Sequence, residues 1–189
     1  MLTWGSALVA SLQEGKIGVI PTDTLYGLVG SALNPDTVER IYKVRKRDAN
    51  KPFIVLIADI SELKRFDVGL SKKEESLLRK CWPGKISVIL ECLSPRFAYL
   101  HRGTKTIAFR LPNHSELRSL LKQTGPLVAP SANIQGKSSA TTIDEAEKYF
   151  KDFVDFYVDG GKLSVNASTV VSLQDGIIEV IRQGEVEIK

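Results

Sequence analysis

The stretch NPDTVERIYKVRKRDANKPFIVLI, residues 34–57, decides the fold class of this chain. Asn34 is a good N-cap, Pro35 suits the first position of a helix, and Asp36 complements the helix dipole. Apolar residues then recur at helical spacing, which predicts a helix ending near Arg45 in a cluster of cations. The apolar run Phe53–Ile57 predicts a buried strand. A helix followed closely by a buried strand indicates an α/β protein.

Similar units extend this pattern in both directions. Two pairs, Ser71 with Glu74 and Thr142 with Glu145, match the capping box that begins a helix. Strands follow one another directly late in the chain, so we expect a twisted, mixed sheet flanked by helices. No repeat or linker is evident, and residues 1–189 are expected to form one domain. The expected helices are Ser71 to about Cys81, Ser115–Gln123 and Thr142 to about Phe150, and the further strands are Ile17–Ile20, Ile86–Leu90, Thr106–Arg110, Leu127–Ala129, Phe153–Val158, Ser168–Leu173 and Ile177–Arg182.

Composition excludes several classes of protein. The 189 residues are 43% hydrophobic, which is enough to build a core. The net charge of +4 permits an anionic ligand without requiring one. No apolar run approaches the roughly 20 residues of a membrane span, and the N-terminus does not resemble a secretory signal. Cys81 and Cys92 form no disulfide framework and no CxxC pair, which favours a reducing, cytoplasmic location. With two histidines and no HExxH motif, we expect no metal held by the protein.

Polar residues follow the first expected strand in PTDTLYGL, residues 21–28. Ligands often bind beyond the carboxyl ends of strands in α/β proteins. The hydroxyls of Thr22 and Thr24 can donate to a carboxylate or a phosphate. An equally good interpretation is a hydrogen-bonded turn in which Asp23 makes an Asx-type bond.

Five cations lie within KVRKRDANK, residues 43–51. Arginine side chains bind phosphate and carboxylate with two parallel hydrogen bonds. The alternative is a solvated helix C-terminus, where cations complement the dipole. Because Pro52 joins this run directly to a buried strand, the cations are held beside the sheet, which favours anion binding.

The loop APSANIQGKSS, residues 129–139, contains a Gly-Lys-Ser sequence but no Walker A motif. That motif needs a glycine where Ser131 stands, and a helix beginning at the Lys-Ser pair. The loop is therefore either a hydroxyl-rich phosphate site or a polar surface loop. Arg110 and Arg182 each end an expected strand, where an arginine lies either in an anion pocket or on an ordinary exposed face.

The chemistry available to these segments is limited to hydroxyls and guanidiniums. The chain contains no GxSxG elbow, no paired-carboxylate signature and no GxGxxG fingerprint. Such groups suit catalysis by positioning and electrostatic stabilisation, as in phosphoryl and nucleotidyl transfer.

Taken together, these segments resemble the YrdC-like family, the L-threonylcarbamoyladenylate synthases. The resemblance runs in the family's order over nearly the whole chain, about residues 17–184. Each block is weakly specific by itself, and the ordered set is specific. The matching blocks are PTDTLYGL (21–28), IYKVRKRDANKPF (41–53), WPGKISVIL (82–90), TIAFRLP (106–112), APSAN (129–133), STVV (168–171) and IRQG (181–184).

The resemblance implies an α/β fold around a basic central cavity. It implies a nucleotidyltransferase that joins L-threonine, bicarbonate and ATP into threonylcarbamoyl-AMP and pyrophosphate. The product would serve the threonylcarbamoyladenosine modification of tRNA, which partner proteins complete. Magnesium would accompany ATP, held mainly by phosphates and water.

Site residues are carried over from the matching motifs by position. Arg45 and Arg47 occupy the family's Lys-x-Arg motif and are expected to be catalytic, with Arg47 also contacting ATP. The threonine site would comprise Thr24, Arg110, Ala129 and Ser168, with Arg110 pairing the carboxylate. The nucleotide site would comprise Arg47, Lys51, Thr106, Ser131, Asn133, Ser139 and Arg182.

Some positions depart from the family pattern. Arg45 replaces a lysine, which keeps the charge but changes its geometry. Leu56 stands where some members carry a histidine, and Lys51 where a smaller polar residue is often found. Lys85 and Ala167 each replace a proline.

Two other functions are considered. A basic concavity could hold tRNA or double-stranded RNA through phosphates, although the net charge of +4 and 7% aromatic residues argue against this. A carbamoyl-adenylate-forming relative, like the similar domain of hydrogenase-maturation carbamoyltransferases, would be expected to carry accompanying domains.

Overall fold

The computed structural model describes residues 1, 3–163 and 166–188 of the chain. Nine strands form one mixed sheet in the order β7-β1-β2-β6-β3-β5-β4-β8-β9. The strands are β1 (Gly18–Ile20), β2 (Gly27–Ser31), β3 (Ile54–Leu56), β4 (Ile86–Glu91), β5 (Thr106–Arg110), β6 (Leu127–Val128), β7 (Phe156–Tyr157), β8 (Thr169–Gln174) and β9 (Ile177–Arg182). The α-helices are α1 (Ser6–Gln13), α2 (Pro35–Arg45), α3 (Lys72–Cys81), α4 (Ala98–His101), α5 (Ser115–Thr124) and α6 (Ile143–Phe150).

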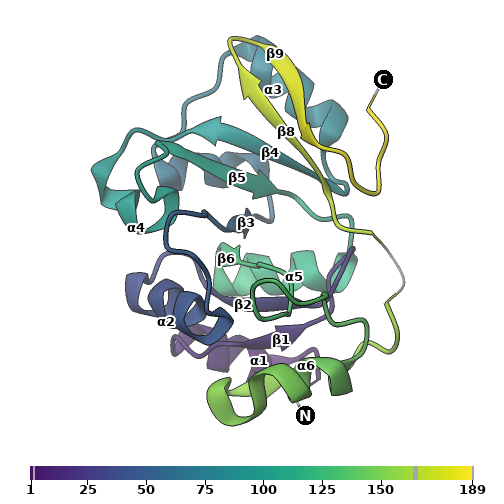
Figure 1. Ribbon diagram of the computed structural model, residues 1–189. Coiled ribbons are helices and arrows are strands. Elements are labelled where there is room, and N and C mark those ends of the chain that lie inside the picture. The colour runs from purple at the N-terminus through teal and green to yellow at the C-terminus, as the bar shows by residue number, and fades with distance from the viewer. Residues whose placement is uncertain (2, 164–165, 189) are drawn as a thin grey trace.

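The sheet is mixed, as the sequence predicts. The pairs β1–β7, β3–β5 and β4–β8 are parallel, and the other neighbouring pairs are antiparallel. Figure 1 shows β1 and β2 in the lower half of the molecule and β4, β5, β8 and β9 in the upper half. The short strands β3 and β6 connect the two halves.

Both faces of the lower half of the sheet are covered by helices. Alternate residues of β1 and β2 point to opposite faces, so Val19 and Leu28 enter one hydrophobic cluster, and Ile20 and Val29 the other. One cluster contains residues of α2 and α6, and the other contains residues of α1 and α5. Burying each such aliphatic side chain contributes about 1.5–3 kcal/mol to folding.

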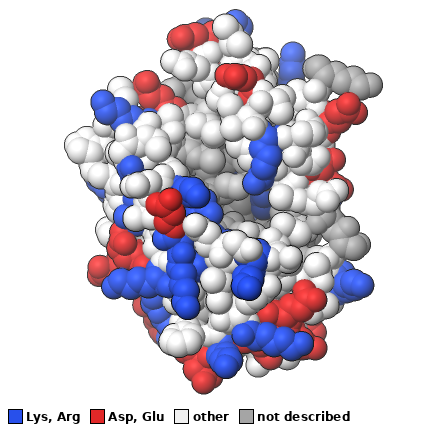
Figure 2. Space-filling view, in the orientation of Figure 1, with Lys and Arg blue, Asp and Glu red and all other residues white. Residues whose placement is uncertain are grey.

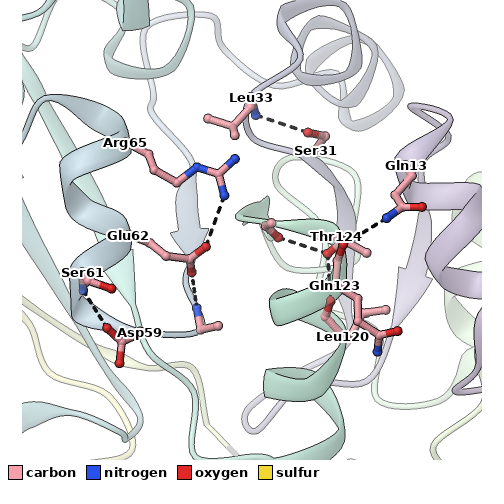
Figure 3. Close-up of polar contacts among 12 residues, drawn as sticks. Gln13, Ser31, Leu33, Asp59, Ser61, Glu62, Arg65, Leu120, Gln123 and Thr124 are labelled. Carbon is pink, nitrogen blue, oxygen red and sulfur yellow. Dashed lines mark hydrogen bonds and ion pairs between the residues drawn. The ribbon is translucent and has the colours of Figure 1, made fainter.

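Polar contacts join elements that are far apart in the sequence. Gln13, at the end of α1, donates its side-chain amide to the carbonyl of Gln123 in α5 at 3.0 Å (Figure 3). On the other face, α2 lies so close to β2 that a Cβ at Gly30 would be 2.4 Å from Thr37 Cγ2. Glycine is therefore required at that crossing.

Helix starts follow the predicted signals closely. Asn34 caps α2 by accepting from the amides of Asp36 and Thr37, and Ser71 with Glu74 forms the predicted capping box of α3. The second capping box is wrong in detail. Thr142 caps α6, but the carboxylate of Glu145 accepts from the amide and hydroxyl of Thr141 instead of the Thr142 amide.

Several elements differ from the prediction. Strand β2 is not among the expected strands; its sequence GLVGS contains two glycines, which are poor strand formers. The expected strand Phe153–Val158 is reduced to β7, since Lys151–Phe153 forms a 3-10 helix. Helices α1 and α4 and the 3-10 helix Ile60–Phe66 were not predicted.

Within the described residues, no helix combines the length and the apolar character needed to span a membrane.

Candidate functional site

A pocket of about 180 Å³ brings together most of the polar segments singled out in the sequence. It lies beyond the ends of β1, β5 and β6 and beside the start of β8. The molecular face drawn in Figure 2 is hollowed near its centre, and lysine and arginine side chains stand around the hollow. The pocket is lined by Thr22, Thr24, Leu25, Tyr26, Gly27, Ile54, Arg110, Ala129, Ser131, Ser139, Ala167, Ser168 and Arg182.

The turn after β1 forms one side of the pocket. Pro21 ends the strand, because it has no amide to donate to the sheet. The hydroxyl of Thr22 then donates to the carbonyl of Leu25 at 2.7 Å and accepts from the amide of Thr24 at 3.1 Å. The two threonine hydroxyls are 3.1 Å apart, and both residues are buried. The turn is therefore hydrogen-bonded and also presents hydroxyls to the pocket.

A buried ion pair forms beside this turn. The guanidinium of Arg110 lies 3.1 Å from a carboxylate oxygen of Asp23, with the side chains 5% and 3% exposed. The other oxygen of Asp23 accepts from the amide of Asn113 at 3.3 Å. The Nε atom of Arg110 is buried and has no hydrogen-bond partner among the described residues. Such a guanidinium, anchored at one edge and lining a pocket, suits an anion.

Burial is the main influence on the pKa of Arg110. Burial lowers the pKa of its guanidinium, the carboxylate of Asp23 opposes this, and the charge of Arg182 lowers the pKa further. Asp23 therefore opposes the combined effect of burial and of Arg182 on the Arg110 guanidinium.

The opposite side of the pocket is formed by Ser168 and Arg182. The guanidinium of Arg182 donates to the carbonyl of Ser168 at 2.8 Å. The hydroxyl of Ser168 lies 2.9 Å from that of Ser87, deep in β4. These contacts hold the Ser168 backbone against the sheet.

Arg45 fastens α2 to the loop that follows β6. Its Nε donates to the carbonyl of Asn133 at 2.9 Å, and its terminal nitrogen donates to the Asn133 side-chain oxygen at 2.7 Å and to the Ser131 hydroxyl at 3.3 Å. Arg45 is 2% exposed, and burial together with the charge of Arg47 lowers its pKa to about 10. Asn133 in turn donates to the carbonyl of Lys137 at 2.8 Å. This network orients the loop, and Arg45 itself does not line the pocket.

The structure brings seven of the expected site residues together at the pocket: Thr24, Arg110, Ala129, Ser131, Ser139, Ser168 and Arg182. Arg47, Lys51, Thr106 and Asn133 lie outside its lining, as Arg45 does. Arg47 turns back and donates to the carbonyls of Lys51 and Pro52, because Lys46 has a left-handed conformation that ends α2. Lys51 is exposed, with its ammonium 3.9 Å from Asp48. Thr106 begins β5, four residues before Arg110, and lines a separate depression beside Ser172.

Three residues were not predicted for the site. Asp23 was interpreted as a turn residue, and nothing local indicates that Arg110, far along the chain, pairs with it. Ser87 is fully buried and touches Ser168, and its position as the one polar residue within the apolar run Ile86–Leu90 was an available signal. Tyr26 accepts from the amide of Gly160 at 2.8 Å and donates to the carbonyl of Gly161 at 2.7 Å.

A magnesium ion would need oxygen ligands. Within the described ranges, no group of three or more His, Cys, Asp and Glu side chains is gathered to hold a metal ion. Asp23, the carboxylate beside the pocket, is already paired with Arg110. The residues present do not fit a magnesium ion held by the protein itself.

Comparison with known proteins gives relatives that are described as threonylcarbamoyl-AMP synthases. The threonylcarbamoyl-AMP synthase of Bacillus subtilis is 37% identical over 183 residues, covering 94% of this chain and 52% of that protein. A putative threonylcarbamoyl-AMP synthase of Methanocaldococcus jannaschii is 34% identical over 185 residues, covering 96% of this chain and 86% of that protein.

The fold has a close counterpart among solved structures. The structure of P. abyssi Sua5 complexed with L-threonine matches with a TM-score of 0.86 and 31% identity, covering 94% of this chain and 53% of that one. This chain thus spans about half the length of the B. subtilis and P. abyssi proteins. The family model Sua5_yciO_yrdC, described as "Telomere recombination", matches residues 10–184. By this match, and by the fold similarity to P. abyssi Sua5, the chain belongs to the Sua5/YciO/YrdC family.

Proposed function

We propose that this protein is an L-threonylcarbamoyladenylate synthase, a nucleotidyltransferase that condenses L-threonine, bicarbonate and ATP into threonylcarbamoyl-AMP and pyrophosphate. The observation that carries the proposal is Arg110, a buried guanidinium that lines a pocket rich in hydroxyls and is anchored by Asp23. The names of the B. subtilis and M. jannaschii relatives support the same activity. All nine strands belong to one sheet, which supports treating residues 1–189 as a single domain.

In this proposal the pocket first holds threonine. The carboxylate of the amino acid pairs with Arg110 in a charge-assisted contact, while Thr24 and Ser168 offer hydroxyls and Ala129 lines the wall. The amino group of threonine combines with bicarbonate to give a carbamate, with loss of water. Because the pocket supplies charges and hydroxyls, its contribution is to hold and align the reactants.

The second step is transfer of the nucleotide. A carbamate oxygen attacks the α-phosphorus of ATP, the bond to the β-phosphate breaks, and pyrophosphate leaves. Ser131, Ser139 and Arg182 border the pocket where the nucleotide would lie. Asn133, bound to Arg45, holds the loop that carries Ser131 and Ser139. We assign Arg47 and Lys51 to the phosphates, which requires the Arg47 side chain to leave the carbonyls it now contacts. Thr106 lies apart from the pocket, so we assign it no contact. Magnesium would be held by phosphates and water.

The product is a mixed anhydride, which is reactive enough to pass its threonylcarbamoyl group to an acceptor. We propose that tRNA adenosine is this acceptor, reached through separate transfer proteins, and that the reaction takes place in the cytoplasm. Both cysteines are free thiols, which agrees with a reducing compartment.

The decisive experiment measures pyrophosphate release by the purified protein with ATP, bicarbonate and Mg²⁺. We expect release only when L-threonine is added. Release without threonine, or none with it, contradicts the proposal.

The Arg110→Ala variant should lose threonine binding by calorimetry and keep binding of a non-hydrolysable ATP analogue, whereas Arg79→Ala, with its side chain 65% exposed, should keep both. Equal loss of both ligands in Arg110→Ala would mean that its role is misassigned. Tight, salt-dependent RNA binding without ATP binding would favour an RNA-binding module instead.

A further inference from the structure

The segment Arg182–Val186, which we call the C-terminal strap, turns back from β9 across the start of β8. Its contacts converge on Thr169, the first residue of β8. The hydroxyl of Thr169 accepts from the amides of Gly184 at 3.0 Å and Val186 at 3.2 Å, and it donates to the carbonyl of Val186. The strap is therefore bound to β8 through one buried side chain.

Glu185 extends this contact to the residues just before β8. Its amide donates to the carbonyl of Ala167 at 2.9 Å. One oxygen of its carboxylate accepts from the amide of Asn166 at 3.1 Å, and the other lies 3.4 Å from the ammonium of Lys85. Glu185 thus contacts the residues on both sides of the Ala167 peptide. Its ion pair with Lys85 also connects the strap to the residue that precedes β4.

Gly184 permits the close approach of the two segments. A Cβ at this position would lie 2.3 Å from the carbonyl oxygen of Ala167 and 2.5 Å from the carbonyl group of Ser168. Both contacts are with backbone, which cannot move aside as a flexible side chain would. Any larger residue here would displace Ala167 and Ser168.

Ala167 and Ser168 both line the pocket. We propose that the C-terminal strap positions this wall, with Gly184 and Glu185 as positioning residues that place the Ser168 hydroxyl toward the bound amino acid. The inference rests on the proposed function for the identity of the ligand. It assigns to residues outside the pocket an effect on substrate affinity.

The expected signature is a change in affinity with little change in stability. The side chains of Lys85 and Glu185 are 31% and 29% exposed, and pairs open to solvent contribute little to folding. The hydrogen bond from the Asn166 amide orients the wall, and it needs an oxygen acceptor on the side chain of residue 185, which a carboxylate or an amide can supply. Loss of the acceptor, rather than loss of the charge, should therefore disturb the wall.

The test compares four variants. Glu185→Ala should raise the KM for L-threonine about tenfold, the size expected for a lost hydrogen bond to a charged group, while kcat changes less than about twofold. Glu185→Gln retains an oxygen acceptor and should keep most of the affinity. Glu187→Ala removes the same charge outside the strap and should behave as wild type. Gly184→Ala should give a larger rise in KM than Glu185→Ala, and if it fails to fold the Glu185 variants decide.

A second readout does not depend on catalysis. The Thr169 amide donates to the carbonyl of Lys85 at 3.1 Å, and its hydrogen exchange should be faster in Glu185→Ala than in wild type or Glu187→Ala. An unchanged KM together with unchanged exchange overturns the inference. Equal changes in KM in Glu185→Ala and Glu187→Ala would also overturn it. If wild type neither binds nor converts threonine, but exchange at the Thr169 amide is still faster in Glu185→Ala, then the proposed function is wrong and the strap still positions the wall.

Discussion

Arg110 and Asp23 show how one pair of residues can set the character of a pocket. Asp23 holds the guanidinium at one edge, and Arg182 adds a second positive charge nearby. A buried charge without its partner is costly, whereas removing both partners costs less. The pair can therefore be tested by its effect on stability, independently of any ligand.

Replacement of Asp23 by alanine should lower the free energy of unfolding by about 3 kcal/mol, because it leaves Arg110 as an uncompensated buried charge. The double variant Asp23→Ala/Arg110→Ala should be less destabilised than the sum of the two single variants. Urea denaturation of all four proteins measures this coupling. A cost below about 1 kcal/mol for Asp23→Ala, with additive effects, would show that water in the pocket already solvates Arg110.

Among the elements, α2 links the core of the molecule to its site. Its N-terminus is capped by Asn34, its apolar residues Val38 and Ile41 are fully buried, and Arg45 at its last turn holds the loop at Asn133. The carbonyl of Arg45 also accepts from the amide of Gln135 at 2.9 Å. Stability of this helix is therefore coupled to the position of the loop that borders the pocket.

The cap of α2 gives an element-scale prediction. Asn34→Ala removes the acceptor for two backbone amides and should cost about 1 kcal/mol of stability, measured by the midpoint of urea denaturation. Asn34→Asp retains a side-chain oxygen at the same place and should cost much less. Equal destabilisation by the two substitutions would mean that packing at Asn34, not capping, is what matters.

At the scale of the whole molecule, carboxylates tie segments that are distant in the sequence. Asp155 accepts from both terminal nitrogens of Arg40 and from the amide of Ile17, and so joins α2, the residue before β1 and the segment before β7. Burial raises the pKa of Asp155, but these hydrogen bonds together with the charges of Arg40 and Lys16 outweigh burial and lower the pKa below its ordinary value. The pKa values of Asp59, Glu74, Glu145 and Glu185 are also lowered, mainly by hydrogen bonds to neighbouring backbone and side chains.

These directions predict acid sensitivity. A carboxyl whose pKa is lower in the folded protein stabilises it fully above the unfolded pKa, and loses that contribution as pH falls through the folded pKa. The urea midpoint should therefore be steady from neutral pH down to about 5 and fall below about 4.5. Asp155→Asn should reduce the slope of this fall, and Glu187→Gln, at an exposed carboxyl, should leave it unchanged. A slope that is identical in all three proteins would exclude Asp155 as a contributor.

Local signals explain why so much of the fold could be predicted. Caps such as Asn34 and Ser71, and apolar runs such as Ile86–Leu90, act over a few residues, and the helices and strands they predict are present. Prediction failed where composition and structure disagree: β2 is a strand in spite of its two glycines, because β1 and β6 pair with it on either side. Tertiary pairing there outweighs local propensity.

The sequence alone determined the α/β class, the mixed sheet, the family resemblance and seven residues that the structure gathers at one pocket. Only the tertiary structure decided that Asp23 faces Arg110, that Arg45 binds the loop at Asn133 instead of lining the pocket, and that the C-terminal strap lies behind Ser168. The physical reason is the range of the interactions involved. Periodicity and capping depend on neighbours in the chain, whereas the contacts of a buried charge depend on strand order and register, which arise when the whole sheet assembles.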